Sequence, residues 1–311
     1  MRIATYYENR LGRNDGSPLY YFQVAKRSGD EVVHFTSQDT GDLEKWGKFD
    51  LNLWVDWGED ALTSMLPYTP MLKIPSPSVY ISSDTHLTPE GREYRFHKAD
   101  QFDWVFFNQK RAVDEYLELH PERAGSVFWL PHAVEPLAYP ATPVALKTYD
   151  LSFVGFVTFR KRVEMLDRMF KEFPNFFYGQ RFSRWIYGEP QDGQDTADIF
   201  RRSKIVFNTA AVDDLNMRNW ECLSTQSFLL TEYTPTMPKA FENKKHLVWY
   251  KTMEEAVELA KYYLEHDEER EAIAKAGYEL VRKNGTYENR WKEILNRIGR
   301  STDPFIPWNL E

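Results

Sequence analysis

Short apolar segments alternate with amphipathic ones along most of the chain, and this alternation constrains the fold more than any other feature. Apolar segments rich in aromatic and β-branched residues are typical of strands, and helical periodicity follows most of them. The clearest unit is a strand expected at 103–107, a helix at 110–119 and a strand at 126–130. Strands that alternate with helices form mainly parallel sheets. The sequence therefore predicts an α/β protein.

A proline- and alanine-rich segment divides this pattern into two series. Residues 131–150 read PHAVEPLAYPATPVALKTYD, and prolines lack an amide donor and favour extended backbone, as in linkers. A chain of 311 residues is also longer than most single domains. We expect an N-terminal domain over 1–135, a linker over 136–149, a C-terminal domain over 150–298, and a tail over 299–311 that packs back toward the first domain.

Composition limits the classes of protein to which the chain can belong. Hydrophobic residues make up 42% and charged residues 28%, which is typical of folded globular proteins. No segment approaches the roughly 18 to 20 apolar residues that a membrane-spanning helix needs, and the N-terminal residues show no signal-peptide pattern. The single cysteine, Cys222, excludes an intramolecular disulfide and agrees with a reducing compartment. We expect a cytoplasmic protein, with a peripheral location at a membrane as the alternative.

The second half carries an ordered set of segments that resembles a known family. The segments are DLSFVG at 150–155, a basic helix start at 160–163, SKIVFN at 203–208, NMRNWE at 216–221 and FLLTE at 228–232. In order and spacing they resemble the donor domain of the group-1 (family 4-like) glycosyltransferases. The resemblance is closest to the branch related to spore maturation protein B.

This resemblance implies the GT-B fold, in which two Rossmann-like domains face each other across a cleft. In that family the C-terminal domain binds a nucleotide-diphosphate sugar, and the N-terminal domain binds the acceptor. The acceptor hydroxyl would belong to a glycan, a glycolipid, a protein or a small molecule. The implied reaction needs no metal and no cofactor beyond the donor substrate. It retains the anomeric configuration, while an inverting reaction, which would need a base, is the alternative.

The resemblance assigns two acidic residues to the donor. Asp213 and Glu221 are eight positions apart, like the family's pair of acids around the start of a donor-domain helix. Glu221 matches the acid that contacts the ribose, whose hydroxyls can donate hydrogen bonds to a carboxylate. Asp213 matches the acid near the sugar or phosphate, although it is one methylene shorter, and Asp214 is the alternative. Without this context, carboxylates at such a spacing more often cap a helix or face solvent.

The diphosphate of such a donor requires cations and amide donors near a helix N-terminus. Lys161 lies six residues after Gly155, which is the family's spacing between its lysine and its strand-end glycine. Phe156 stands where the family has an arginine, so Arg160 or Arg162 is expected to take that role. A basic turn that only solvates a helix is an equally weighted interpretation.

The predicted donor-domain helix carries one more candidate cation and one departure from the family. Arg218 lies one turn before Glu221, and the resemblance makes it a second cation for the diphosphate. Five residues after Glu221 the family has a glycine, where this chain has Gln226. Because glycine adopts positive φ at little cost, we expect this turn and the shape of the nucleotide pocket to differ.

Two polar segments of the N-terminal half follow predicted strands. Gly16 and Ser17 belong to the loop between the first strand and the first helix, where backbone amides can approach a phosphate or the acceptor. A plain polar connection is the alternative. Asp84 and His86 follow the strand expected at 78–81, and a carboxylate and an imidazole are suited to orienting or deprotonating an acceptor hydroxyl. We carry both as catalytic candidates, with capping of the next helix as the alternative.

Two other functions compete with the glycosyltransferase interpretation. A glycosyltransferase acting on modified nucleic-acid bases would need a basic rim, against a formal net charge of -8. A noncatalytic nucleotide-sugar or glycan-binding protein on the same scaffold is suggested by the departures at Phe156, Asp213 and Gln226. The primary expectation is a glycosyltransferase whose partners are a nucleotide-sugar donor and a hydroxyl acceptor.

Overall fold

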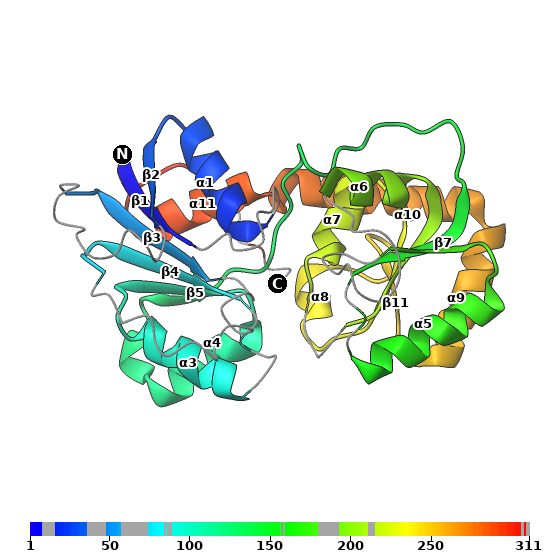
Figure 1. The fold of residues 1–311 in the computed structure, drawn as a ribbon, viewed down its shortest axis with the longest axis horizontal. Coiled ribbons are helices and arrows are strands. Elements are labelled where there is room, and N and C mark those ends of the chain that lie inside the picture. Colours follow the sequence, from blue (N-terminus) through cyan, green and yellow to red (C-terminus); the bar gives the residue numbers. More distant parts are fainter. Residues whose placement is uncertain are drawn as a thin grey trace. The chain divides into compact units, whose positions relative to one another are not determined.

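The structure is a computed structural model, and its described residues form two compact units. Unit 1 comprises Met1–Pro131 and Arg290–Phe305, and unit 2 comprises His132–Asn289 and Ile306–Glu311. The described residues are 1–7, 16–35, 48–56, 74–83, 85, 89–155, 157, 159–179, 193–210, 215–305 and 308. Figure 1 shows that each unit contains a sheet with helices packed on both of its faces.

Unit 1 is built on a parallel sheet with the strand order β2-β1-β3-β4-β5-β6. Its strands are β1 (Arg2–Tyr6), β2 (Glu31–Phe35), β3 (Leu51–Asp56), β4 (Ser78–Ser82), β5 (Trp104–Phe107) and β6 (Val127–Trp129). Its helices are α1 (Ser17–Arg27), α3 (Pro89–Ala99), α4 (Lys110–Leu119), the 3-10 helix Pro121–Arg123 and most of α11 (Tyr287–Arg297). In Figure 1, α1 lies on one face of this sheet, and α3 and α4 lie on the other.

Unit 2 repeats this plan with a parallel sheet in the order β11-β10-β9-β7-β8. Its strands are β7 (Tyr149–Val154), β8 (Phe176–Gly179), β9 (Ser203–Asn208), β10 (Leu229–Glu232) and β11 (Val248–Tyr250). Its helices are α5 (Arg160–Glu172), α6 (Gly193–Arg201), α7 (Arg218–Ser224), α8 (Met237–Ala240), α9 (Met253–Glu265) and α10 (Asp267–Asn284). In Figure 1, α5 and α9 cover one face, and α6, α7 and α10 cover the other.

The strands of both sheets are strongly apolar because helices cover both faces. Phe106 and Phe107 in β5, and Ile205, Val206 and Phe207 in β9, are fully buried. This burial is the expected pattern for parallel strands between two helical layers. The predicted strand–helix–strand unit corresponds to β5, α4 and β6. The sequence-based prediction of an α/β fold with mainly parallel sheets is therefore confirmed.

Local sequence also explains where the helices around the unit 2 sheet begin and which face they bury. In α5, Met165, Leu166 and Met169 recur at helical spacing and are buried in the unit 2 core. The helix α9 begins after Thr252, whose hydroxyl oxygen accepts a hydrogen bond from the backbone amide of Glu255 at 3.1 Å. Packing of the apolar face of α5 leaves its first turn next to the carboxyl ends of the strands.

Candidate functional site

The described donor-site candidates of unit 2 gather at the carboxyl edge of its sheet. The strands β7, β9 and β10 end there at Val154, Asn208 and Glu232, and α5 and α7 begin beside this edge. In parallel α/β sheets, ligands bind outside the carboxyl ends of the strands. We refer below to this region as the carboxyl edge of unit 2.

Arg218 and Gly155 are in direct contact at this edge. The buried Arg218 donates from Nε to the carbonyl oxygen of Val154 at 2.9 Å, and Nη2 contacts the same oxygen. Its Nη1 contacts Oδ1 of Asn208, and its Cζ lies 4.3 Å from the centroid of the Phe153 ring. A Cβ atom on Gly155 would lie 2.0 Å from Nη2. A side chain at position 155 would therefore have to displace the guanidinium of Arg218.

Lys161 is paired with a residue that sequence reasoning did not select. Its Nζ contacts Oε1 of Glu232, and the side chain of Lys161 is 54% exposed while that of Glu232 is 13% exposed. The other carboxylate oxygen, Oε2, accepts hydrogen bonds from the Thr209 hydroxyl at 3.0 Å and from the Ala210 amide at 3.1 Å. The lysine is thus accessible at the edge, while the carboxylate is anchored to the end of β9.

The two arginines on either side of Lys161 have different environments. Arg160 is 92% exposed, and its Nε donates to Oε1 of Glu164 at 2.7 Å, one turn later on α5. Arg162 is buried, and its Nη2 donates to the carbonyl oxygen of Thr209 at 2.8 Å. Burial lowers the pKa of the Arg162 guanidinium to about 10, so it still carries its charge at neutral pH. Arg162 therefore binds the backbone directly after β9, and Arg160 faces solvent.

Glu221 lies within a wholly buried helix. Every residue of α7 is buried, and Glu221 is in its first turn, where a negative charge interacts favourably with the helix dipole. A polar network surrounds this helix start. Asn208 exchanges hydrogen bonds with Asn216 at 3.2 Å in both directions and donates to the Thr231 hydroxyl at 2.9 Å. The Tyr250 hydroxyl donates to the carbonyl oxygen of Asn208 at 2.8 Å.

Sequence reasoning missed Glu232 and this asparagine network, although a signal was present. The strands β9 and β10 have apolar, fully buried centres, and they end in the polar residues Asn208 and Glu232. A polar residue that ends a buried parallel strand faces the ligand-binding edge of the sheet. That rule would have selected both residues.

Some sequence-predicted site residues lie outside the described part of the chain. These are Asp84, His86, Asp213 and Asp214, and Phe156, which departs from the family pattern, lies outside it as well. Gly16 and Ser17 are described in unit 1, at the start of α1. Gly16 has φ 128°, a backbone conformation that residues with a side chain rarely adopt, and Ser17 is buried. This backbone requirement supports a structural role for Gly16, and its role at phosphate or acceptor stays a prediction.

Gln226, which stands where the family has a glycine, is the basis for expecting the turn after α7 to differ from the family's turn. Its φ is 56°, in the left-handed region, although no glycine is present. The backbone here therefore keeps a conformation that glycine would adopt at lower cost.

Unit 1 contains a buried charged cluster that the sequence did not indicate. The carboxylate of Asp56, at the end of β3, lies 3.6 Å from Nε of Arg95 and 3.7 Å from Nζ of Lys98. The Tyr80 hydroxyl donates to the same carboxylate, and Nζ of Lys98 lies 3.9 Å from the centroid of the Trp54 ring. Burial, together with the Asp56 charge, raises the pKa of Tyr80, so the hydroxyl keeps its proton. The cluster ties α3 to the carboxyl end of β3.

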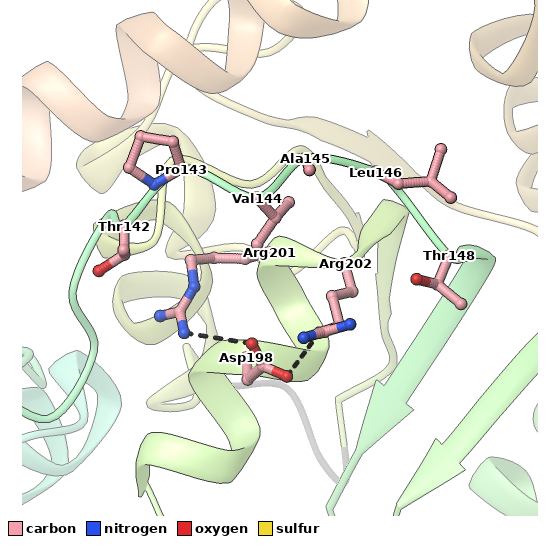
Figure 2. Close-up of a pocket in the computed structure, with 9 residues that line it drawn as sticks. All are labelled: Thr142, Pro143, Val144, Ala145, Leu146, Thr148, Asp198, Arg201 and Arg202. Atoms are coloured by element: carbon pink, nitrogen blue, oxygen red, sulfur yellow. Dashed lines mark hydrogen bonds and ion pairs between the residues drawn. The ribbon is translucent and has the colours of Figure 1, made fainter.

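Unit 2 also has a pocket of about 440 Å³ between α6 and the segment that precedes β7 (Figure 2). Its lining residues are Thr142, Pro143, Val144, Ala145, Leu146, Thr148, Asp198, Arg201 and Arg202. Asp198 accepts hydrogen bonds from Arg202 Nε at 2.7 Å and from Arg201 Nη2 at 3.4 Å, as Figure 2 shows. Arg201 Nη1 donates to the carbonyl oxygen of Pro140 at 2.8 Å. The two cations are thus engaged by protein groups, and no donor-site candidate lines this pocket.

Two features are absent from the described residues. No helix in this part of the chain is long and apolar enough to cross a membrane. No group of three or more His, Cys, Asp or Glu side chains in the same part is arranged to hold a metal ion. Cys222 lies buried in α7, and burial raises the pKa of its thiol, so the thiol stays protonated at neutral pH.

Comparison with known proteins gives one sequence match and several structural ones. Residues 160–296 match a family model described as glycosyl transferase-like, and this region includes α5, α7 and β10. No curated protein is significantly similar to the chain in sequence.

Three of the solved structures that resemble the chain cover 86 to 97% of it at low sequence identity. HepE from Anabaena, in complex with UDP and glucose, is 12% identical with a TM-score of 0.71, covering 97% of this chain and 100% of that one. A sucrose-phosphate synthase from Thermosynechococcus elongatus is 9% identical with a TM-score of 0.68, covering 96% and 98%. A UDP-forming α,α-trehalose-phosphate synthase from Burkholderia xenovorans is 11% identical with a TM-score of 0.58, covering 86% and 78%. The chain therefore has the GT-B type of α/β fold, with two Rossmann-like domains, and its second half is glycosyl transferase-like in sequence.

Proposed function

We propose that this protein is a glycosyltransferase that moves a sugar from a nucleoside-diphosphate sugar to a hydroxyl acceptor. The observation that carries the proposal is the carboxyl edge of unit 2, where Lys161, Arg218 and Glu221 lie within the segment that matches the glycosyl transferase-like model. Cations and a buried acid at this edge suit a ligand that carries both a diphosphate and a ribose. Within the group-1 enzymes, we assign the chain to the branch related to spore maturation protein B.

Lys161 and Arg218 would neutralise the diphosphate. Arg218 is held by the carbonyl oxygen of Val154 and by Asn208, so its charge is fixed before a ligand arrives. Lys161 is exposed on a flexible stem and can move to a phosphate oxygen. Fixed cations stabilise most where negative charge increases during the reaction, which here is the departing diphosphate. Glu221 would accept hydrogen bonds from the ribose hydroxyls.

The proposed reaction proceeds with retention and without metal. The bond between the anomeric carbon and the diphosphate oxygen breaks, and its electron pair leaves with the diphosphate. The acceptor oxygen forms the new bond to the anomeric carbon and gives its proton to the departing diphosphate. UDP is the first nucleotide to test, because solved HepE complexes contain UDP and UDP-glucose.

Ligand-induced thermal stabilisation tests the donor site. A ligand that binds the native state raises the melting temperature by mass action. We expect one of UDP, GDP, ADP and their glucose conjugates to stabilise the protein equally with and without EDTA. Glu221→Gln should abolish the shift, whereas Glu258→Ala, which alters an exposed acid of α9, should preserve it. The absence of a shift with every nucleotide would refute the proposal.

Turnover is tested separately from binding. With the nucleotide sugar identified, release of the nucleoside diphosphate is measured over a panel of glycan, glycolipid and small-molecule acceptors, and the anomeric configuration of the product is determined by NMR. Retention is the expected result. Binding of the donor without transfer to any acceptor would instead favour a noncatalytic nucleotide-sugar-binding protein.

A further inference from the structure

Glu232 has the features of a fixed anion at the carboxyl edge of unit 2. Its Oε2 accepts hydrogen bonds from the Thr209 hydroxyl at 3.0 Å and from the Ala210 amide at 3.1 Å. The charge of Glu232 also acts on the buried guanidinium of Arg162, which is itself bonded to the carbonyl oxygen of Thr209 at 2.8 Å. None of these contacts involves Lys161. The carboxylate is therefore held independently of its lysine partner.

Lys161 is the mobile member of the pair. It lies in the first turn of α5, its side chain is 54% exposed, and its ammonium group contacts Oε1 of Glu232. An ion pair with one exposed partner is weak, because solvent screens it and holding a long side chain costs entropy. The ammonium group can consequently leave the carboxylate for a stronger anion.

We propose that Glu232 is a positioning residue that competes with the bound diphosphate for Lys161 and thereby weakens the binding of the nucleoside diphosphate product. This inference rests on the proposed function and on the role of Lys161 at the diphosphate. If one ammonium group serves both anions, the fixed carboxylate lies close to the diphosphate and repels it. A cation that stayed on the diphosphate would retain the product, whereas Lys161 can return to Glu232 and let the product leave.

The charge of the ligand makes this effect selective for the product. A free nucleoside diphosphate has a terminal phosphate that ionises further near neutral pH, whereas the sugar conjugate is esterified at that position. Repulsion by Glu232 therefore acts more strongly on the product than on the donor. The expected consequence is faster product release at little cost to donor binding.

Isothermal titration of wild type, Glu232→Gln, Lys161→Met and the double variant with UDP, UMP and uridine tests the proposal. Release of Lys161 from its carboxylate partner, together with the loss of one screened charge beside the diphosphate, should lower the Kd of UDP in Glu232→Gln by about fivefold to tenfold. The gain in affinity should be smaller for UMP and absent for uridine. Lys161→Met should weaken UDP binding, and Glu232→Gln should have a smaller effect in the double variant than in wild type. In turnover, Glu232→Gln should increase inhibition by UDP more than it changes the KM of the donor.

A matched control comes from another lysine–glutamate pair of unit 2. Glu242 is exposed and pairs with Lys245 at 2.6 Å, so Glu242→Gln should leave UDP affinity unchanged. If Glu232→Gln does not fold, Glu232→Asp, which withdraws the carboxylate by one methylene, should give a smaller gain in UDP affinity. Unchanged or weaker UDP binding in a folded Glu232 variant overturns this inference alone. Failure of wild type to bind any of UDP, GDP and ADP overturns the proposed function and this inference together.

Discussion

Replacing Gly155 with alanine should destabilise the protein strongly, because the new methyl group would occupy the space of the Arg218 guanidinium. The added Cβ would lie 2.0 Å from Nη2 and 3.2 Å from Cζ of Arg218, and 3.3 Å from Cζ of Phe153. The guanidinium would have to leave the carbonyl oxygen of Val154 and Oδ1 of Asn208. A hydrogen bond to a charged group contributes about 1.5 to 3 kcal/mol, and the guanidinium would lose its bonds to both of these oxygens. We expect a loss of about 3 kcal/mol.

Equilibrium unfolding in urea measures this cost, and a double-mutant cycle assigns it to the contact. Methionine at position 218 lacks the guanidinium, so Gly155→Ala should cost less than about 1 kcal/mol in an Arg218→Met background. Gly125→Ala is the control, because a Cβ there meets nothing within 4 Å, and its effect should stay within about 0.5 kcal/mol. An equal cost of Gly155→Ala in both backgrounds would refute the reasoning, as would a cost below about 1 kcal/mol in wild type.

Three further predictions concern stability. Gln226 has φ 56°, so Gln226→Gly should stabilise the protein by about 0.5 to 1 kcal/mol in urea unfolding; a loss of stability would contradict the strain argument. Asp56→Asn should lower the free energy of unfolding by about 3 kcal/mol, because it removes the buried carboxylate next to the two cations of α3. An unchanged urea midpoint would show that other groups neutralise these two cations. Burial lowers the pKa of His246, whose Nδ1 accepts a hydrogen bond from the Glu242 amide at 3.1 Å. The neutral imidazole of His246 stabilises the folded state above the unfolded-state pKa, and this contribution is lost as the pH falls through the lower folded-state pKa. His246→Gln should therefore reduce the loss of stability between about pH 7 and pH 5. Identical pH slopes for wild type and His246→Gln would exclude that residue as the cause.

The sequence predicted those parts of the molecule that depend on local pattern. The apolar segment at 103–107 and the amphipathic segment at 110–119 identified β5 and α4 because burial on both sheet faces and on one helix face leaves a periodic signature. The same signature placed Gly155 and Lys161 at the end of a strand and the start of a helix. The α/β fold followed from these assignments, whereas the choice of donor-site candidates came from the resemblance to the group-1 glycosyltransferases.

The pairing of side chains did not follow, because it depends on how distant elements align. Lys161 and Glu232 are 71 residues apart, and they meet only because α5 begins next to the end of β10. Asp56 meets Arg95 and Lys98 through the packing of α3 against β3. No periodicity in the sequence encodes which charged residues of two such elements will be in contact.

The contact between Gly155 and Arg218 also restricts how the sequence can change during evolution. The guanidinium fills the volume that any side chain at position 155 would need. A homologue with a larger residue at position 155 should therefore carry a shorter or uncharged residue at position 218, and one that keeps the arginine should keep the glycine. The two positions should vary together as a pair, although 62 residues lie between them in the chain.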